Sequence, residues 1–360
     1  MSYVNPLKFI SWLKQEGLFS RVVENQGHFR LIFEELFKIR KRDELLIIGD
    51  LGEPGKRSAP VMTGCYVSAA KKMGLSYKLI LQRPRYIGDV SSMELIRALD
   101  NLQDGGFITI STTGKLGSFK KFGKSFRKIV KARRFRFVST PNLSELPTTR
   151  LIDLTQSLNI DYRKLQQTAI KIEKAFNIGK EIIIRTKAGT NLKVGIQGMK
   201  AIRNDGEIYS EFGGNIPVGE VYIPPRGKRV NGTVVLDGSV RTRYGTHLIK
   251  TPVVLHVENG SVVKITGNSD VATKLRETLD WAEKRSHHDW GCRRIGEVGI
   301  GINPAAKVVG PTVLNEKAKG TAHVAIGSNA WFGGSVYSII HLDQVFMDAR
   351  IYVDGALLKY

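Results

Sequence analysis

The sequence predicts an α/β protein, with an N-terminal parallel sheet and flanking helices followed by a C-terminal β-rich α+β domain. In the first half, apolar strand-like runs alternate with amphipathic helical segments, as in a parallel sheet covered by helices. In the second half, short strands follow one another between Gly and Asn turns. This change predicts a boundary near residue 180, and therefore domains at 1–180 and 181–360.

The N-terminal elements follow from apolar periodicity. Residues 5–40 carry Phe, Ile, Trp and Leu at helical spacing. Residues 44–52 form an apolar run that ends in a turn, which predicts a buried strand. The alternation then continues with a helix at 61–73, a strand at 77–81, a helix at 92–102, a strand at 106–111, a basic helix, and a strand at 136–140.

The C-terminal elements are mostly strands. An amphipathic helix at 160–176 precedes them, and a helix at 270–284 interrupts them. The tripeptide Glu258-Asn259-Gly260 is a strong hairpin signal. Strands are expected at 181–186, 191–196, 232–238, 252–260 and 261–267, and one long strand at 341–355.

Composition narrows the functional classes. The 360 residues contain 55 Lys and Arg against 33 Asp and Glu, a formal net charge of +22. Such an excess favours contact with nucleic acid, ribosomes or other anionic surfaces. Two cysteines do not make a disulfide framework, and no apolar run has the length of a membrane span. The N-terminus lacks a signal-peptide layout, so we expect a cytoplasmic protein.

The excess charge is concentrated at residues 115–136, which contain basic side chains, interleaved phenylalanines and no acid. Such a segment can contact phosphates and stack on bases, as in a ribosome- or RNA-associated protein. The favoured alternative is an amphipathic helix, because Phe119, Phe122 and Phe126 lie three and four residues apart. In that case the phenylalanines pack inward and the basic face is solvated.

Three common motifs for nucleotide binding or catalysis are missing from the sequence. The turn at 49–55 matches neither the dinucleotide-binding glycine pattern nor a P-loop. No GxSxG elbow is present, which argues against a serine hydrolase. The chemistry of this chain therefore has to come from another group of residues.

His341, Asp343 and His323 suggest a metal site. His341 and Asp343 lie two apart in the predicted strand, so both side chains point to the same face. Imidazole with carboxylate suits Zn, Co, Mn or Fe(II). Taken alone, the pair is more often a surface pair, and His323, among small and apolar residues, a hydrogen-bonded core histidine.

Three glutamates strengthen the metal hypothesis. Glu297 lies in an apolar, Gly-rich run, and Glu220 has similar surroundings. A carboxylate in such a run is costly to bury unless it is paired or bound to metal. Glu316 precedes His323 in the same stretch. These features together predict one site, held by side chains far apart in the sequence.

At these residues the chain resembles the aminopeptidase T family of metalloproteases, from about residue 40 to the end and most specifically in the last 150 residues. The resemblance implies two divalent ions, a hydrolytic water, an N-terminal α/β domain over the site, and a homodimer. The implied metal ligands are Glu220, Glu297, His323, His341 and Asp343. Glu297 or else Glu316 would accept the proton of the metal-bound water. Our first hypothesis is therefore a metal-dependent aminopeptidase, or a related metallohydrolase, that acts on peptides or small molecules with one or two Zn, Co or Mn ions.

One departure from that family leads to an alternative. Ala330 stands where the family aminopeptidases carry a tyrosine, and the spacing from Glu316 to His323 also differs. A related branch uses the same architecture with a single Fe(II) to open hydroxylated pyridine rings with oxygen. Two histidines and one aspartate, as His323, His341 and Asp343 offer, suit such an iron site.

Overall fold

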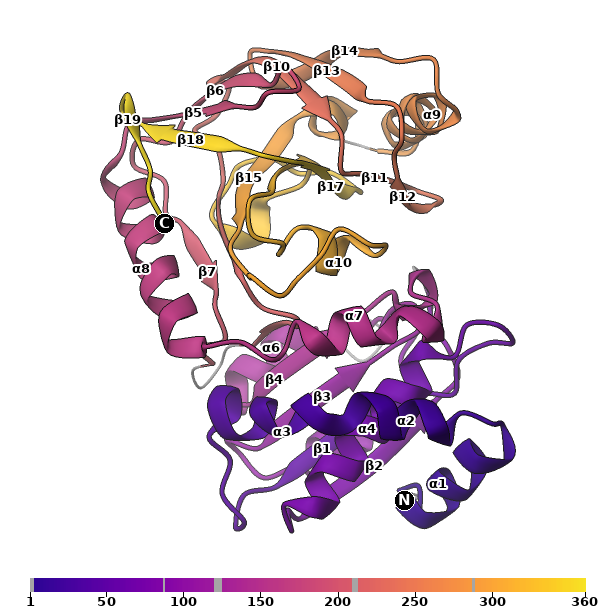
Figure 1. Cartoon of the computed structure of the whole chain (residues 1–360). Coiled ribbons are helices and arrows are strands. Elements are labelled where there is room, and N and C mark those ends of the chain that lie inside the picture. Colours follow the sequence, from indigo (N-terminus) through magenta and orange to yellow (C-terminus); the bar gives the residue numbers. More distant parts are fainter. Residues whose placement is uncertain (1–2, 87, 120–124, 209–212, 287–288) are drawn as a thin grey trace. The chain divides into compact units, whose positions relative to one another are not determined.

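The chain folds into two compact units (Figure 1). The computed structural model describes residues 3–86, 88–119, 125–208, 213–286 and 289–360. Unit 1 contains Met1–Asn159 and Gly206–Val218, and unit 2 contains Ile160–Asp205 and Gly219–Tyr360. The predicted fold class is confirmed, since a parallel sheet occurs together with antiparallel sheets.

The predicted domain limits at residue 180 stay a prediction. The compact units place the helix Tyr162–Ile178 with the C-terminal strands, because it packs against two of them. They also place one short C-terminal strand, Gly213–Asn215, with the N-terminal sheet. None of the helices in the described part of the chain is both long and apolar enough to cross a membrane.

Unit 1 contains a five-stranded sheet of order β2-β1-β3-β4-β8, in which every neighbouring pair is parallel. Its strands are β1 (Leu45–Asp50), β2 (Tyr77–Gln82), β3 (Phe107–Ser111), β4 (Arg136–Thr140) and β8 (Gly213–Asn215). Its α-helices are α1 (Pro6–Gln15), α2 (Phe19–Asn25), α3 (Phe29–Leu31), α4 (Ser58–Lys72), α5 (Met93–Asp100), α6 (Phe126–Ala132) and α7 (Leu151–Gln156). Unit 1 also contains 3-10 helices at η1 (Gln26–His28), η4 (Leu143–Glu145) and η5 (Thr148–Arg150), and a π-helix at η2 (Ile32–Phe37).

Helices cover both faces of this sheet, as the alternation of β1 requires. Leu46 and Ile48 belong to an apolar core that includes side chains of α5 and α6. Gly49 faces the other way, against α4, where an added Cβ would lie 2.2 Å from the Thr63 hydroxyl. Successive strand residues point to opposite faces, so one apolar strand contributes to two helix–sheet interfaces.

The turn after β1 has a structural role. The buried Asp50 carboxylate accepts hydrogen bonds from the backbone N–H of Thr113 at 2.7 Å and of Gly52 at 2.9 Å. Burial raises the pKa of Asp50, and these hydrogen bonds oppose that rise. The carboxylate thereby ties the end of β1 to the loop that follows β3.

Among the described residues of the basic segment, Phe126–Ala132 alone is helical, so the predicted helix is found only in its second half. Residues 120–124 lie outside the described residues. Phe119 packs against Phe126 with ring centroids 5.9 Å apart, and Phe119 is buried. The inward packing of the phenylalanines fits the favoured alternative, whereas contact with nucleic acid or the ribosome stays a prediction, as does a homodimer.

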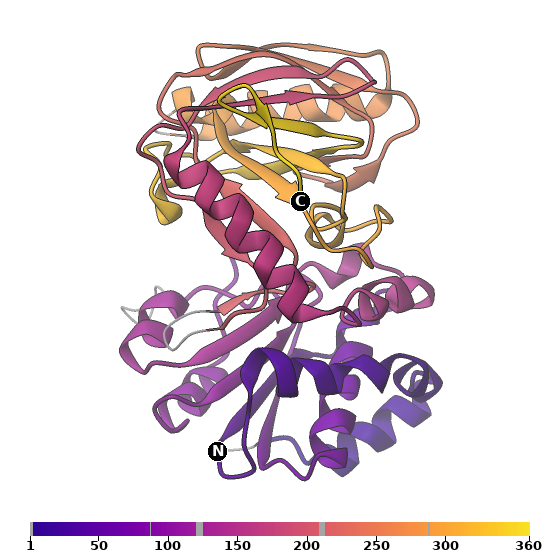
Figure 2. The ribbon, with the colours of Figure 1, turned by 60° about the vertical axis from the view of Figure 1, so that its left-hand side comes forward.

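Unit 2 contains two seven-stranded antiparallel sheets (Figure 2). The first, of order β14-β13-β10-β6-β5-β18-β19, consists of β5 (Glu181–Arg185), β6 (Asn191–Gly195), β10 (Val230–Leu236), β13 (Val253–Glu258), β14 (Ser261–Thr266), β18 (Arg350–Val353) and β19 (Ala356–Leu357). The second, of order β12-β11-β17-β16-β15-β9-β7, consists of β7 (Ile202–Asn204), β9 (Glu220–Ile223), β11 (Ser239–Thr242), β12 (Gly245–Leu248), β15 (Ile295–Gly301), β16 (Ala322–Gly327) and β17 (His341–Phe346).

The helices of unit 2 are α8 (Tyr162–Ile178), α9 (Asp270–Arg285) and α10 (Thr312–Asn315), with short 3-10 turns η6 (Asp289–Arg293) and η7 (Ala330–Phe332). Two of these helices, α8 and α9, have side-chain N-caps. Asp161 and Ser269 accept hydrogen bonds from the first turns of α8 and α9. The hairpin predicted at 258–260 is confirmed, with left-handed φ at Asn259 and Gly260.

The long strand expected at 341–355 is wrong as a single element. The chain leaves β17 after Phe346, turns at Asp348 with φ 51°, and continues as β18. Because β17 and β18 belong to different sheets, this turn carries the chain from one sheet of unit 2 to the other.

Candidate metal centre

The candidate ligands lie on four neighbouring strands of the second sheet of unit 2. Across these strands, Glu220 pairs with Gly301, His323 with Gly299, and Ala325 with both Glu297 and Asp343, while His341 pairs with Gly327. The candidate ligand positions on neighbouring strands are therefore in register with one another. Directly paired residues point to the same face of a sheet, so all five side chains project from one face.

Small residues keep that face open. Between the candidate ligands lie Gly299, Gly301, Ala325 and Gly327. A Cβ on Gly299 would lie 2.1 Å from Nε2 of His323, so the imidazole crosses the space that a side chain would fill. Gly299, two residues after Glu297, thus makes room for the ring.

The imidazoles and carboxylates meet at short distances. Nε2 of His323 lies 3.2 Å from Oε1 of Glu297 and 3.7 Å from Oε2 of Glu220. Nε2 of His341 lies 3.2 Å from Oδ1 of Asp343 and 3.6 Å from Oε2 of Glu297. Glu297, His323 and Asp343 offer ligand atoms that all lie within 4.8 Å of one another. The expected convergence is present, while the assignment of these residues as metal ligands stays a proposal.

Lys317 is a member of the cluster that sequence reasoning missed. Its Nζ lies 2.6 Å from Oε1 of Glu220 and also forms an ion pair with Glu316. The lysine is fully buried, although it lies in a polar stretch that resembles a solvated loop. Glu316, expected as an alternative proton acceptor, is therefore paired to an ammonium group rather than to one of the histidines.

Asn315 holds this pair in place. Its Oδ1 accepts from the backbone N–H of Val309 at 2.9 Å and of Gly310 at 3.1 Å. Its Nδ2 donates to Oγ of Ser239 at 2.9 Å. These hydrogen bonds anchor the short helix α10 and fix the position of the backbone that leads to Glu316 and Lys317.

Burial and mutual charge set the protonation of the cluster. Burial favours the neutral imidazole, but the neighbouring carboxylates more than offset it and raise the pKa of His323 to about 9 and of His341 to about 10. Burial raises the pKa of Glu297 and, despite the Lys317 charge, that of Glu316 to about 8. Burial would also raise the pKa of Asp343, but the His341 charge holds it well below its usual range.

The donor set fits a transition-metal ion. Nδ1 of His341 donates to the carbonyl oxygen of Ser328 at 2.8 Å, which fixes the ring and directs Nε2 into the cluster. A ligating histidine usually makes this type of bond with its other nitrogen. Two imidazoles with carboxylates suit Fe(II), Zn, Co or Mn better than Ca. The residues therefore fit a divalent ion bound by Glu297, His323 and Asp343, whose ligand atoms lie within 4.8 Å of one another, with Nε2 of His341 3.2 Å from Asp343.

Aromatic rings border the cluster at His341. The Trp331 ring centroid lies 4.7 Å from that of His341, and Phe332 lies 6.3 Å from it. Trp331 is 48% exposed, so one face of a large apolar ring remains available next to a candidate ligand. The neighbouring Ala330, at the position where we expected the missing tyrosine, offers no hydroxyl.

We expect Gly299→Ala to disrupt the centre, because the new methyl group overlaps the His323 imidazole. Overpacking of this kind costs about 1–3 kcal/mol, and displacement of the ring should also weaken metal binding. Unfolding and metal content should be measured together. Gly27→Ala is the matched control, because its added Cβ meets nothing within 4 Å. Wild-type metal content in Gly299→Ala would show that His323 is not a ligand.

We also expect protons and metal to compete for the two imidazoles. With pKa values of about 9 for His323 and about 10 for His341, both rings hold an extra proton at pH 7, and a metal ion needs them neutral. The apparent affinity should therefore rise with pH, by roughly ten- to hundredfold per unit for one or two protons released. Chelator competition across the neutral range measures this slope. A flat profile would contradict the assignment.

Known proteins place this geometry in a family context. Residues 159–358 match the family 2,5-dihydroxypyridine 5,6-dioxygenase. The chain is similar to the solved 2,5-dihydroxypyridine dioxygenase from Pseudomonas putida KT2440, with a TM-score of 0.70 and 15% identity over 94% of this chain and 98% of that chain. It is also similar to wild-type AmpT from Thermus thermophilus, with a TM-score of 0.62 and 16% identity over 94% of this chain and 97% of that chain. No curated protein sequence matches the chain.

These likenesses support the shared fold and favour one of the two enzyme hypotheses. At such identities, the two solved structures show a shared fold alone, and the aminopeptidase T resemblance is supported only at that level. The sequence match favours the ring-cleaving alternative over the peptidase. Because the matched residues 159–358 span more than half of the 360 residues, the chain belongs to the 2,5-dihydroxypyridine 5,6-dioxygenase family.

Proposed function

We propose that this protein is a mononuclear Fe(II) dioxygenase that opens the ring of a hydroxylated nitrogen heterocycle. Family membership names the reaction class. The observation that carries the choice of one metal ion over two is the position of Lys317. Its ammonium group lies between Glu220 and Glu316, the carboxylates that a second divalent cation would need.

The charge of Lys317 disfavours a two-metal hydrolase site. Two cations within bonding distance of the same carboxylate repel each other strongly in a buried site. Lys317 keeps its charge there, because Glu220 and Glu316 more than offset the effect of burial and raise its pKa. The ammonium group therefore compensates these carboxylates, and the remaining donors, with two histidines and one aspartate, suit a single ion.

The ligand set has the composition of a non-haem iron site. His323 and His341 would contribute imidazoles, and Asp343 and Glu297 carboxylates. Two histidines with a carboxylate are the combination found in non-haem Fe(II) oxygenases. A bound Fe(II) supplies the one-electron chemistry that O₂ needs in order to react with an aromatic ring. The hydrogen bond from His341 to the Ser328 carbonyl holds one imidazole in orientation throughout.

The other residues bind and orient the substrate. The exposed face of Trp331, beside His341, can stack on a planar ring, since aromatic pairs favour offset or edge contacts. Glu297, with its pKa raised by burial, lies beside both imidazoles and is placed to accept the proton of a ring hydroxyl at its carboxylate. A basic carboxylate next to an apolar ring suits a hydroxylated aromatic substrate better than a peptide.

The proposal is tested by reconstituting the protein anaerobically with Fe(II) or with Zn, Co or Mn. With iron, we expect O₂ uptake that depends on added 2,5-dihydroxypyridine and matches its loss of ring absorbance. With the other metals, we expect neither this reaction nor appreciable cleavage of leucyl substrates. Leucyl hydrolysis with two Zn, Co or Mn ions per chain would instead favour the metallohydrolase hypothesis.

A further inference from the structure

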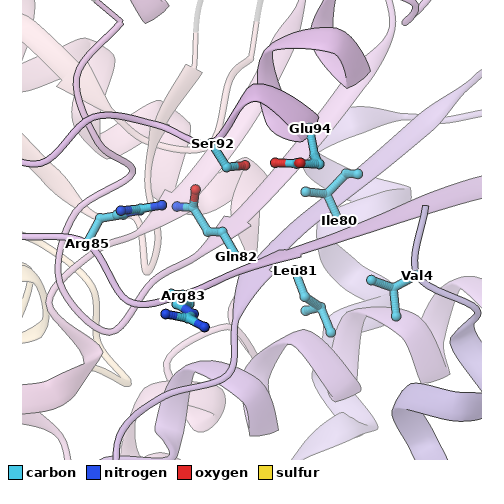
Figure 3. Close-up of a pocket in the computed structure, with 8 residues that line it drawn as sticks. All are labelled: Val4, Ile80, Leu81, Gln82, Arg83, Arg85, Ser92 and Glu94. Carbon is cyan, nitrogen blue, oxygen red and sulfur yellow. The ribbon is translucent and has the colours of Figure 1, made fainter. Parts of the chain in front are cut away.

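Unit 1 has a pocket of its own at the outer edge of the parallel sheet. The pocket has a volume of about 380 Å³ and is formed by Val4, Ile80, Leu81, Gln82, Arg83, Arg85, Ser92 and Glu94 (Figure 3). It lies where the edge strand β2 ends and α5 begins. Open α/β sheets commonly bind ligands at the carboxyl ends of their strands, and this volume suits a small molecule.

Two polar atoms in this pocket lack a partner in the described part of the chain. Gln82 is only 5% exposed, and its Oε1 accepts no hydrogen bond. The amide cannot be turned to exchange the two atoms, because Nε2 already donates to the Leu116 carbonyl at 3.0 Å. Nε of Arg85 is likewise buried without an acceptor. A buried hydrogen-bonding group without a partner is unfavourable, so a ligand that bonds to both atoms would remove this cost.

The oxygen atoms of the pocket and its cationic group lie in different places. Figure 3 shows the oxygens of Ser92 and Glu94 turned toward each other, the Gln82 oxygen pointing toward Ser92, and the Gln82 amide nitrogen turned toward the Arg85 guanidinium. Three oxygens that include a carboxylate favour an ammonium group, which donates three hydrogen bonds. The guanidinium favours a carboxylate, which it can bind through two parallel bonds. The nearby guanidinium also makes this cluster unfavourable for a divalent cation.

We propose that this pocket binds an α-amino acid with an apolar side chain. Its carboxylate pairs with Arg85, and its ammonium group donates to Gln82 and Glu94. The apolar part of the ligand lies against Val4 and Leu81, the apolar lining residues that are only partly buried. This inference does not depend on the reaction of the metal centre, because all the lining residues belong to unit 1 and the cluster to unit 2.

The test is isothermal titration calorimetry of the full chain with L-isoleucine. We expect saturable binding at one site per chain. L-Isoleucinamide lacks the carboxylate and 3-methylpentanoate lacks the amine, and each should bind at least about tenfold more weakly, because a polar site rejects a ligand that leaves its groups unpaired. No saturable heat with L-isoleucine, or equal binding of the three compounds, would overturn the proposal.

Variants separate this pocket from other sites. Arg85→Met should weaken binding at least about tenfold, and Glu94→Gln should also weaken it; Glu94 is exposed, so this variant stays informative if Arg85→Met does not fold. Arg97→Met and Asp100→Asn make matched charge changes at exposed positions of the same helix and should change affinity less than about twofold. Binding that survives both pocket variants, or that disappears in His341→Ala, would place the amino acid elsewhere.

Discussion

His341→Ala should abolish iron binding and ring cleavage while the protein remains folded. His341 supplies one of two imidazoles, and it is the more exposed of the two, at 23% against 0% for His323, so its truncation disturbs the core less. Loss of a residue that only orients a metal ligand costs about 10–100-fold in affinity or activity. Loss of the ligand itself should therefore exceed about a hundredfold. Iron content per chain and O₂ uptake measure the effect.

A second histidine provides the control for this experiment. His256 lies half-buried on β13, where Nε2 contacts Oγ1 of Thr266 at 3.4 Å, away from the cluster. His256→Ala should keep full iron content and turnover. If His341→Ala instead retained about one iron per chain and the activity of the parent, His341 would be excluded from the centre.

The candidate ligands could be predicted because each breaks a local rule. A carboxylate such as Glu297 in an apolar, Gly-rich run needs a partner, and a His-x-Asp pair on a strand faces one way. These patterns can be recognised in the sequence without knowing how the strands pair. What brings the residues together is the antiparallel pairing of β9, β15, β16 and β17, which is non-local and leaves no trace in any single segment.

Lys317 could not be predicted for the opposite reason. The run from Glu316 to Lys319 has the composition of an exposed loop, and Lys319 is indeed exposed. Lys317 is buried because Asn315 anchors the preceding turn and because Glu220 arrives from a distant strand. Similarly, the strand at 341–355 was overextended because both halves are apolar and only the two-sheet architecture requires the break.

Lys317→Met should destabilise the protein and alter its metal stoichiometry. Removing one partner of a buried ion pair costs about 3–5 kcal/mol, because the other charge is left uncompensated. Here the Glu220 carboxylate would lose its ammonium partner at 2.6 Å, and Glu316 would lose the same contact. A melting curve should show a fall of several degrees, whereas Lys319→Met, at an exposed neighbouring position, should have little effect.

The same variant tests the proposal of a single metal ion. With the ammonium group gone, Glu220 and Glu316 can share a second divalent cation, since carboxylate oxygens are ligands for Zn, Co and Mn. Bound metal should rise from about one toward about two ions per chain when these metals are supplied. The added ion should also restore part of the lost stability, because a ligand that binds only the folded state stabilises it. A stoichiometry that stays at one, with no rescue by metal, would mean that Lys317 does not take the place of a second ion.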